Sequence, residues 1–413
     1  MTVETPVLVV FDDRTARAWR PFTLTRPAGE LLFGGFTLRA RAERVFGLPC
    51  LGHIVPGGLD GFEEHDAPPA LDPAAVPVDR PRLFLSSRAV PAWPVEPPVL
   101  GDEPALVVVG GEPAGWWAPA RSPAPDASFL EDPQQHAPDG MAVLRFEGLM
   151  LRHVWELVVR SSGQVARDVA ALFADAPAPS APAGVHLIGD DALILGADVQ
   201  LEPGVVLDTR EGPIWLESGV RVRSFTRLCG PAYIGRDSVL EGGSLSGVTV
   251  GPVCHLHGEV EETVVLGYSN KHHEGFLGHA YLGRWVNLGA FTTNSNLKNN
   301  YDTIDLWTPD GPRDTGELKM GCLIGDHVKT GIGTLLNTGT VVEAACNLFG
   351  NEMPPKYVAP FSWGTGSALV EYDCERFLQM AETAMSRRNV TLTDGLKRLL
   401  RAVAAARANG ARP

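Results

Sequence analysis

The chain has 413 residues, of which 44% are hydrophobic and 20% charged, and its formal net charge is −14. This length predicts two or three domains, and the apolar content is sufficient for a core in each of them. The acidic balance argues against nucleic acid or an anionic membrane as the main partner. A local basic pocket for a phosphorylated substrate stays compatible with it.

Six cysteines are scattered along the chain without any Cys-x-x-Cys pair. This spacing favours reduced thiols in a cytoplasmic protein over a zinc ribbon or a thioredoxin-like site. The sequence opens on an apolar strand, not on a basic region followed by a long apolar run, so we expect no signal peptide. No apolar stretch is long enough to span a bilayer.

The first pattern along the chain is that of an α/β domain over residues 1–175. Val7–Phe11 (VLVVF) predicts a buried parallel strand, and a helix is expected from about 35 to 46. Short strands are expected at 83–85 and 105–109, within a Pro-, Ala- and Gly-rich region. One or two helices should follow over 153–173, and the Pro/Ala-rich segment 176–184 is the expected linker.

After the linker, short apolar triplets separated by Gly, Asp or Pro recur about every six residues. This period predicts a triangular parallel β-helix over 185–365, in which inward aliphatic side chains stack turn on turn. The period lapses over 297–319, and we expect this segment to be a loop ejected from one corner. Residues 366–413 predict a C-terminal helical extension, with Thr393 as the N-cap of its second helix.

The stretch 267–301 concentrates the polar chemistry: Lys271, His272 and His273 are adjacent, and a run of asparagines follows. A neutral imidazole is well matched to accept a proton near neutral pH, and amide side chains suit sugar hydroxyls. Asparagines inside a β-helix can instead form ladders that only satisfy backbone groups. His255 and His257 have ligand-like spacing, but without a carboxylate or cysteine partner in the pattern we expect no metal site.

Several motifs resemble the bifunctional N-acetylglucosamine-1-phosphate uridyltransferase/glucosamine-1-phosphate acetyltransferase family, and most closely a divergent bacterial branch described as sugar nucleotidyltransferases. The motifs lie at 11–13, 22–27, 282–292, 294–301, 325–332, 337–341 and 361–364. The resemblance implies an α/β nucleotidyltransferase-like N-terminal domain, a left-handed parallel β-helix of hexapeptide repeats, and C-terminal helices.

The same resemblance implies an acetyl-CoA-dependent enzyme that acts on a sugar amine as a homotrimer. It places the general base at His273 and an amide ligand at Asn287, while Phe276 stands where the family has tyrosine. The residues expected to bind substrate are Lys271, His272, Asn294, Asn296, Lys298, Asn299, Asn300, Tyr301, His327 and Lys329.

The N-terminal half departs from the family at the groups that nucleotidyl transfer needs. Residues 12–19 replace the Gly-rich loop, and the metal-binding Asp-Gly-Asp has no counterpart. Mg²⁺ is therefore expected only if this domain is active. The candidate nucleotide-binding residues are Asp12, Asp13, Arg26, Arg39 and Arg41, although the helix arginines could also form a solvated face.

The leading hypothesis is an acetyl-CoA-dependent N-acetyltransferase for an amino-sugar phosphate or a nucleotide-linked amino sugar. One alternative is a sugar-1-phosphate nucleotidyltransferase whose β-helix mainly oligomerises the chain. Another is a non-catalytic scaffold that binds sugar nucleotides.

Overall fold

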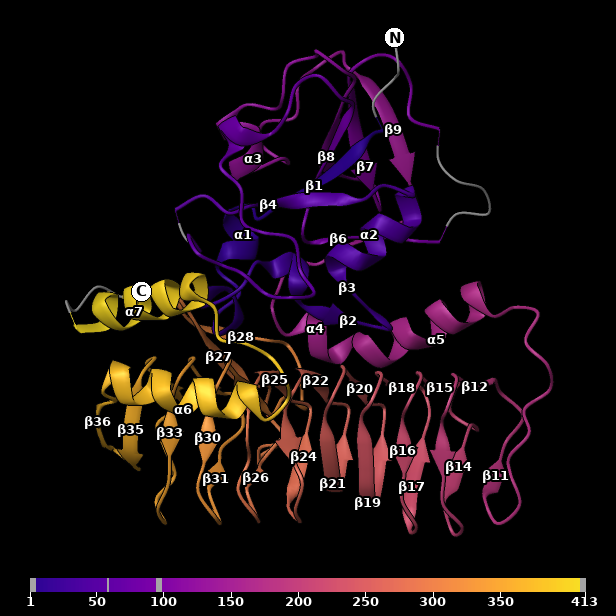
Figure 1. Cartoon of the computed structure of the whole chain (residues 1–413), viewed down its shortest axis with the longest axis vertical. Coiled ribbons are helices and arrows are strands. Elements are labelled where there is room, and N and C mark those ends of the chain that lie inside the picture. Colours follow the sequence, from indigo (N-terminus) through magenta and orange to yellow (C-terminus); the bar gives the residue numbers. More distant parts are fainter. Residues whose placement is uncertain (1–4, 58, 94–98, 409–413) are drawn as a thin grey trace.

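The computed structural model describes residues 5–57, 59–93 and 99–408. An α/β domain lies against one side of a long β-solenoid, and helices from both ends of the solenoid run along that same side (Figure 1). None of the helices in the described ranges combines the length and apolarity needed to cross a bilayer.

The N-terminal domain is built on a six-stranded sheet in the order β4-β1-β5-β8-β7-β9. β8 runs antiparallel to both neighbours, and the other strands are parallel to one another. The strands are β1 (Val7–Phe11), β4 (Cys50–Ile54), β5 (Arg82–Ser86), β7 (Ala105–Val109), β8 (Glu112–Ala118) and β9 (Ala142–Phe146). β1 is buried and parallel to both neighbours, as expected, and the tight turn that joins β7 to β8 makes the sheet mixed.

Alternate residues of β1 bury both of its faces. Leu8 and Val10 pack with α2 (Leu38–Phe46), while Val9 and Phe11 pack with Phe129 of α3 (Ala127–Glu131) on the other face. α2 begins where the Thr37 side chain accepts a hydrogen bond from Ala40 N, and the left-handed Gly47 ends it. The shorter elements are α1 (Arg14–Arg17), β2 (Leu32–Phe33), β3 (Phe36–Thr37), β6 (Ala89–Pro91), β10 (Gly148–Met150), α4 (Glu156–Val159) and α5 (Ser161–Leu172).

The solenoid begins at β11, and one of its faces is a nine-stranded parallel sheet. That face comprises β12 (Leu193–Leu195), β15 (Ile214–Leu216), β18 (Ala232–Ile234), β20 (Thr249–Val250), β22 (Val264–Gly267), β25 (Tyr281–Arg284), β29 (Cys322–Ile324), β32 (Thr340–Val342) and β34 (Tyr357–Val358). Val250, Val265 and Leu282 stack in register within the buried core, as the hexapeptide period predicted. The predicted fold class, a left-handed β-helix after an α/β domain, is thereby confirmed.

The strands of the other faces also pair turn on turn. They are β11 (His186–Ile188), β13 (Gln200–Leu201), β14 (Val206–Asp208), β16 (Arg221–Val222), β17 (Thr226–Cys229), β19 (Val239–Ser246), β21 (His255–Glu261), β23 (Asn270–Lys271), β24 (Phe276–Gly278), β26 (Thr293–Asn294), β30 (Lys329–Thr330), β31 (Leu335–Leu336), β33 (Asn347–Leu348), β35 (Ser362–Thr365) and β36 (Ala368–Glu371). Leu282 pairs with Ile324 across an insertion that forms the hairpin β27 (Asp305–Thr308) and β28 (Gly311–Asp314), so the chain leaves the solenoid where the period lapses.

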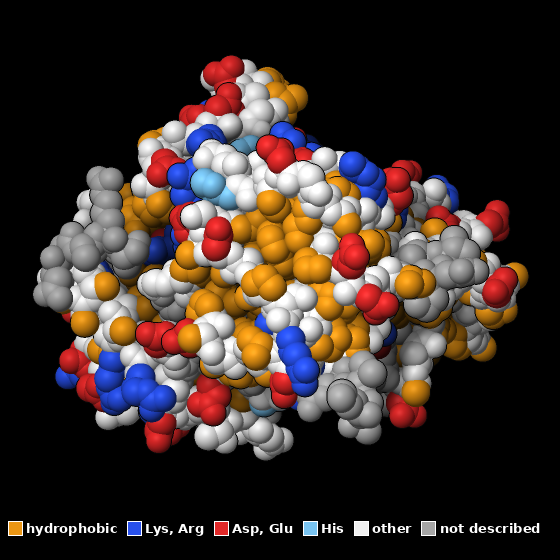
Figure 2. Space-filling view, turned by 90° about the horizontal axis from the view of Figure 1, so that it is seen from above, with side chains coloured by type: hydrophobic (Ala, Val, Ile, Leu, Met, Phe, Trp, Pro, Cys, Tyr) orange, Lys and Arg blue, Asp and Glu red, His pale blue; other side chains and the backbone are white. Residues whose placement is uncertain are grey.

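The α/β domain and the solenoid share one core. Trp19 and Phe22 pack in the same buried cluster as Tyr281 and Leu323. The C-terminal helices α6 (Cys374–Ser386) and α7 (Asp394–Ala408) cover a corner of the solenoid, and Leu396 N donates to the Thr393 hydroxyl, as expected of an N-cap. Seen from the side of the α/β domain, hydrophobic side chains gather near the centre of the surface, with acidic and basic side chains interspersed around them (Figure 2).

Candidate functional site

A cluster of histidines occupies one corner of the solenoid, which we call the histidine corner: Glu241, His255, His257, His272, His273 and Glu274. β19 and β21 supply the first three residues, and the turn between β23 and β24 supplies the others. A pocket of about 390 Å³ opens there, lined also by Ala290 and Phe291. The corner therefore combines imidazoles and carboxylates at an accessible surface.

His273 is exposed, and its ring lies 5.1 Å from that of His272. Within the described part of the chain its ring nitrogens make no hydrogen bond. Its backbone carbonyl accepts a hydrogen bond from Lys271 Nζ, which also donates to His257 O at 2.9 Å. Burial lowers the pKa of Lys271 to about 8 and lowers the pKa of His272. Lys271 thus holds the turn in place, and the His273 imidazole stays available to a ligand.

A second pocket, of about 500 Å³, lies between the solenoid and α6, and we call it the helix-side pocket. Asn287 Oδ1 accepts a hydrogen bond from Asn270 Nδ2 at 3.3 Å, and Arg388 donates to Asn270 Oδ1 at 3.1 Å. Burial lowers the pKa of Lys329, also in the wall, to about 8. The pocket is lined by Tyr268, Asn270, Trp285, Val286, Asn287, Lys329, Met380, Ala384, Arg387 and Arg388. Cations, amides and an aromatic pair make this surface suitable for a phosphorylated ligand.

The two residues predicted to be catalytic thus line different pockets, His273 at the histidine corner and Asn287 in the helix-side pocket. Asn270, Asn287 and Lys329 pair as successive bridges, so Asn287 also belongs to an asparagine ladder of the kind considered from the sequence. His272 and Lys271 lie with His273, and Lys329 lies with Asn287.

Other residues expected to bind substrate are held by the fold itself. Buried Asn294 accepts from Gly278 N and donates to Gly278 O, and Asn296 contacts the His279 ring. His327 stacks on Trp285, and burial lowers its pKa to about 3. Lys298 donates to Thr303 O and Asn300 to Asp302, while Asn299 and Tyr301 are exposed on the inserted loop. The asparagine run is therefore spread between the solenoid interior and the loop.

The predicted nucleotide-binding residues of the N-terminal domain are engaged by one another and by neighbouring groups. Arg41 forms a fully buried bidentate pair with Asp168, and Arg39 pairs with Glu30 and Glu43. Arg39 and Arg41 are thus partly and fully buried and do not form the solvated face that was the alternative, whereas Arg44 of the same helix is exposed.

The carboxylates at the end of β1 do not fit a magnesium site as they stand. Both Asp13 oxygens accept from the Arg88 guanidinium, and Ser86 donates to one of them. Asp12 Oδ2 accepts from Ala28 N, and burial raises the pKa of Asp12. A divalent cation would have to displace a guanidinium from Asp13, which is unfavourable because the two cations compete for the same oxygens.

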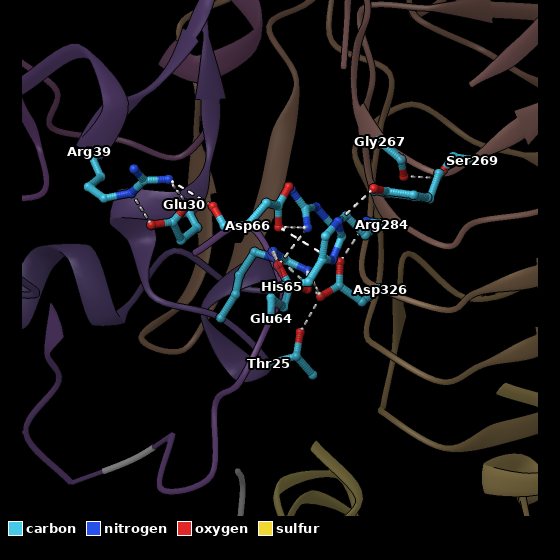
Figure 3. Close-up of polar contacts among 12 residues, drawn as sticks. Thr25, Glu30, Arg39, Glu64, His65, Asp66, Gly267, Ser269, Arg284 and Asp326 are labelled. Carbon is cyan, nitrogen blue, oxygen red and sulfur yellow. Dashed lines mark hydrogen bonds and ion pairs between the residues drawn. The ribbon is translucent and has the colours of Figure 1, made fainter. Parts of the chain in front are cut away.

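Arg26 belongs to a buried ionic network between the domains, formed by Arg26, Glu64, Asp66, Arg284 and Asp326 (Figure 3). Its Nη2 lies 2.8 Å from Asp326 Oδ2 and 2.9 Å from Glu64 Oε1. Arg284 bridges Glu64 and Asp66 from the solenoid side, and Thr25 donates to Asp326. The network joins two loops of the α/β domain to two turns of the solenoid.

Sequence reasoning missed Glu241 and Glu274 at the histidine corner and Arg387 and Arg388 in the helix-side pocket. Glu241 lies on β19, which pairs with the His255 strand, so aligning the hexapeptides by register would have found it. These two arginines, which directly follow α6, carry no local signal, because only the docking of α6 brings them to the pocket of Asn287.

Comparison with known proteins supports the two-part architecture. Residues 8–176 match the family model described as sugar nucleotidyl transferase. The chain is 29% identical over 91 residues to a bifunctional sugar-1-phosphate nucleotidylyltransferase/acetyltransferase of Sulfurisphaera tokodaii, covering 22% of this chain and 23% of that protein. It is 26% identical over 176 residues to the bifunctional protein GlmU of a Nostoc species, covering 37% of this chain and 35% of that protein. The matches thus span between about a quarter and a third of these relatives.

Among solved structures, an Arabidopsis UDP-N-acetylglucosamine acyltransferase aligns with 13% identity and a TM-score of 0.23, over 50% of this chain and 78% of that one. The chain thus combines a domain that matches the sugar nucleotidyl transferase family model with a β-helix that follows it. The resemblance to the bifunctional sugar-1-phosphate nucleotidyltransferase/acetyltransferases, inferred from the motifs, is confirmed at low identity.

Proposed function

We propose that this chain is an acetyl-CoA-dependent N-acetyltransferase for an amino-sugar phosphate or a nucleotide-linked amino sugar, with His273 as general base. The observation that carries the proposal is the exposed, unbonded imidazole of His273 in the pocket of the histidine corner. An imidazole without a hydrogen-bond partner beside an open pocket can accept a proton from a bound amine.

The chemistry requires one proton transfer and one displacement. The sugar amine attacks the thioester carbon, a C–N bond forms, and the C–S bond breaks to release the coenzyme A thiolate. His273 takes the proton that the attacking nitrogen loses and returns it to the thiolate. The Lys271 contact to His273 O keeps the imidazole at the pocket while this happens.

The helix-side pocket supplies the second element of the proposal, a place for phosphate groups. Lys329, Arg387 and Arg388 line it, and a phosphate pairs with arginine through two parallel hydrogen bonds. His273 is exposed at the histidine corner, and a neighbouring subunit of a homotrimer would cover it. Light scattering on the purified protein tests the trimer.

The test of acyl transfer is coenzyme A thiol release from acetyl-CoA in the presence of a panel of amino-sugar phosphates and nucleotide-linked amino sugars. We expect turnover with at least one of them, and a loss of about 10²–10⁴-fold in kcat for His273→Ala. His186→Ala, an exposed histidine on β11, is the matched control and should leave the rate unchanged. An unchanged rate in His273→Ala removes this residue from the mechanism.

A second candidate function is sugar-1-phosphate nucleotidyl transfer, favoured by the family match over residues 8–176. A pocket of about 500 Å³ beside α1 gathers Arg14, Arg152 and Arg313 with the aromatic side chains of Trp19 and Trp155. Pyrophosphate release from a nucleoside triphosphate and a sugar 1-phosphate tests this activity. Arg152→Met should weaken this activity, because it removes a cation from the pocket, and the exposed guanidinium is not needed for folding. The absence of pyrophosphate release with any nucleotide would exclude nucleotidyl transfer.

A further inference from the structure

Three side chains of the histidine corner come from three consecutive turns of the solenoid. Glu241 lies on β19, His255 begins β21, and His272 follows β23. The register pairs Val239 with His255 and His255 with Asn270. Each turn therefore brings one side chain with a metal-ligating atom to the same corner.

The ligand atoms lie at distances close to those that a metal ion requires. Glu241 Oε1 is 3.0 Å from His255 Nδ1 and 3.6 Å from His272 Nδ1, and the three atoms all lie within 4.8 Å of one another. Tetrahedral bonds of roughly 2.0–2.1 Å place ligand atoms roughly 3.4 Å apart. The required spacing lies between the two distances from Glu241 Oε1 to the imidazole nitrogens. The half-exposed His272 ring can turn to shorten the remaining distance, which joins the two imidazoles.

The carboxylate of this cluster is already oriented. Arg223 Nε holds Glu241 Oε2 at 2.7 Å, which leaves Oε1 directed toward the two imidazoles. Second-sphere hydrogen bonds of this kind fix a ligand carboxylate in metal sites. Arg223 has the same sign of charge as a metal ion, but its side chain is 52% exposed, so water screens the repulsion.

We propose that Glu241, His255 and His272 form a binding site for a divalent transition-metal ion, with Zn²⁺ the best match. Two imidazoles and one carboxylate suit zinc, whereas Mg²⁺ and Ca²⁺ prefer all-oxygen sites. Three protein ligands leave a fourth position open, and His272 lies in the wall of the pocket that also contains His273. In this assignment His272 is a metal ligand and not a sugar contact, independently of whether the chain transfers acyl groups.

The experiment is a metal titration of the full chain, freed of any affinity tag and dialysed against a chelator. Isothermal titration with Zn²⁺ and elemental analysis after gel filtration should give one ion per chain. Co²⁺ should give visible d–d bands of a tetrahedral nitrogen/oxygen site.

Matched variants decide between this site and adventitious binding. His255→Gln, His272→Gln and Glu241→Gln should each weaken Zn²⁺ binding at least 100-fold, whereas His186→Gln should have no effect. His272→Gln is the informative variant, because its half-exposed side chain is not needed for folding. Less than one-tenth of an ion per chain, affinity unchanged in His272→Gln, or an intense thiolate-to-cobalt band from the cysteines would each overturn the proposal.

Discussion

The interdomain ionic network predicts that Arg26→Met destabilises the protein strongly. Arg26 donates to Asp326 and Glu64, and all three side chains are at most 9% exposed. The intact network pairs two arginines with three carboxylates; without Arg26, one arginine would face all three. Removing one partner of a buried ion pair costs about 3–5 kcal/mol, because the remaining charge stays buried and unpaired.

The assay is thermal unfolding at pH 7, followed by tryptophan fluorescence. A loss of about 3–5 kcal/mol corresponds to a fall in Tm of about 6–20 °C for domains of this size. Asp326→Asn should cost less, since it leaves two arginines facing two carboxylates. Arg401→Met breaks the exposed Arg401–Glu375 pair and is the control, which should not shift Tm.

The pH dependence gives a second readout of the same network. Burial opposes ionisation of Asp326, but Arg26 and Thr25 outweigh it and leave the pKa of Asp326 below its ordinary value. A lowered carboxyl pKa stabilises the folded state above the ordinary value near 3.8 and loses this effect as pH falls through the folded pKa. The difference in unfolding free energy between wild type and Arg26→Met should therefore become smaller below about pH 4. The reasoning is refuted if Arg26→Met unfolds at the wild-type temperature, or if Asp326→Asn is the more destabilised variant.

Three further outcomes follow from individual contacts. Tyr281→Phe removes a hydroxyl that accepts from Leu32 N and donates to Leu32 O, and urea unfolding should show a loss of about 1–3 kcal/mol; an unchanged midpoint would contradict this. Raising the pH from about 8 to about 10.5 should stabilise the protein, because Lys271 and Lys329 lose their protons in this range when unfolded but are already largely neutral when folded. A pH series of urea unfolding midpoints should show this rise in stability for the wild type and not for the variant with Met at both positions. Gly321→Ala places a Cβ 2.0 Å from a backbone carbonyl of the preceding turn, so the melting temperature of this variant should fall. The Cβ of Gly333→Ala meets no neighbour within 4 Å, but φ at this position is +72°. The smaller loss of stability in Gly333→Ala would therefore report backbone strain alone.

Much of the fold was predictable from local patterns. The hexapeptide period predicted the solenoid and its inserted loop, and the apolar faces around Leu378 and Leu399 predicted the two terminal helices. The order of strands in the N-terminal sheet was not predictable, because β8 lies in a Pro- and Gly-rich stretch and its alternation is weak. At the candidate site, His272 and His273 were found because they adjoin in sequence, while Glu241 joins them only through the register of the turns.

The solenoid follows from local pattern alone, because a residue that recurs every sixth position faces inward on every turn. Which charged groups stay available to a ligand depends instead on contacts between distant parts of the chain. Arg26 and Asp326 are 300 residues apart and neutralise each other in the interface, whereas the His273 ring stays unbonded at a corner. Whether a charged side chain can meet a ligand depends on the partner that folding brings to it, and local sequence patterns do not reveal that partner.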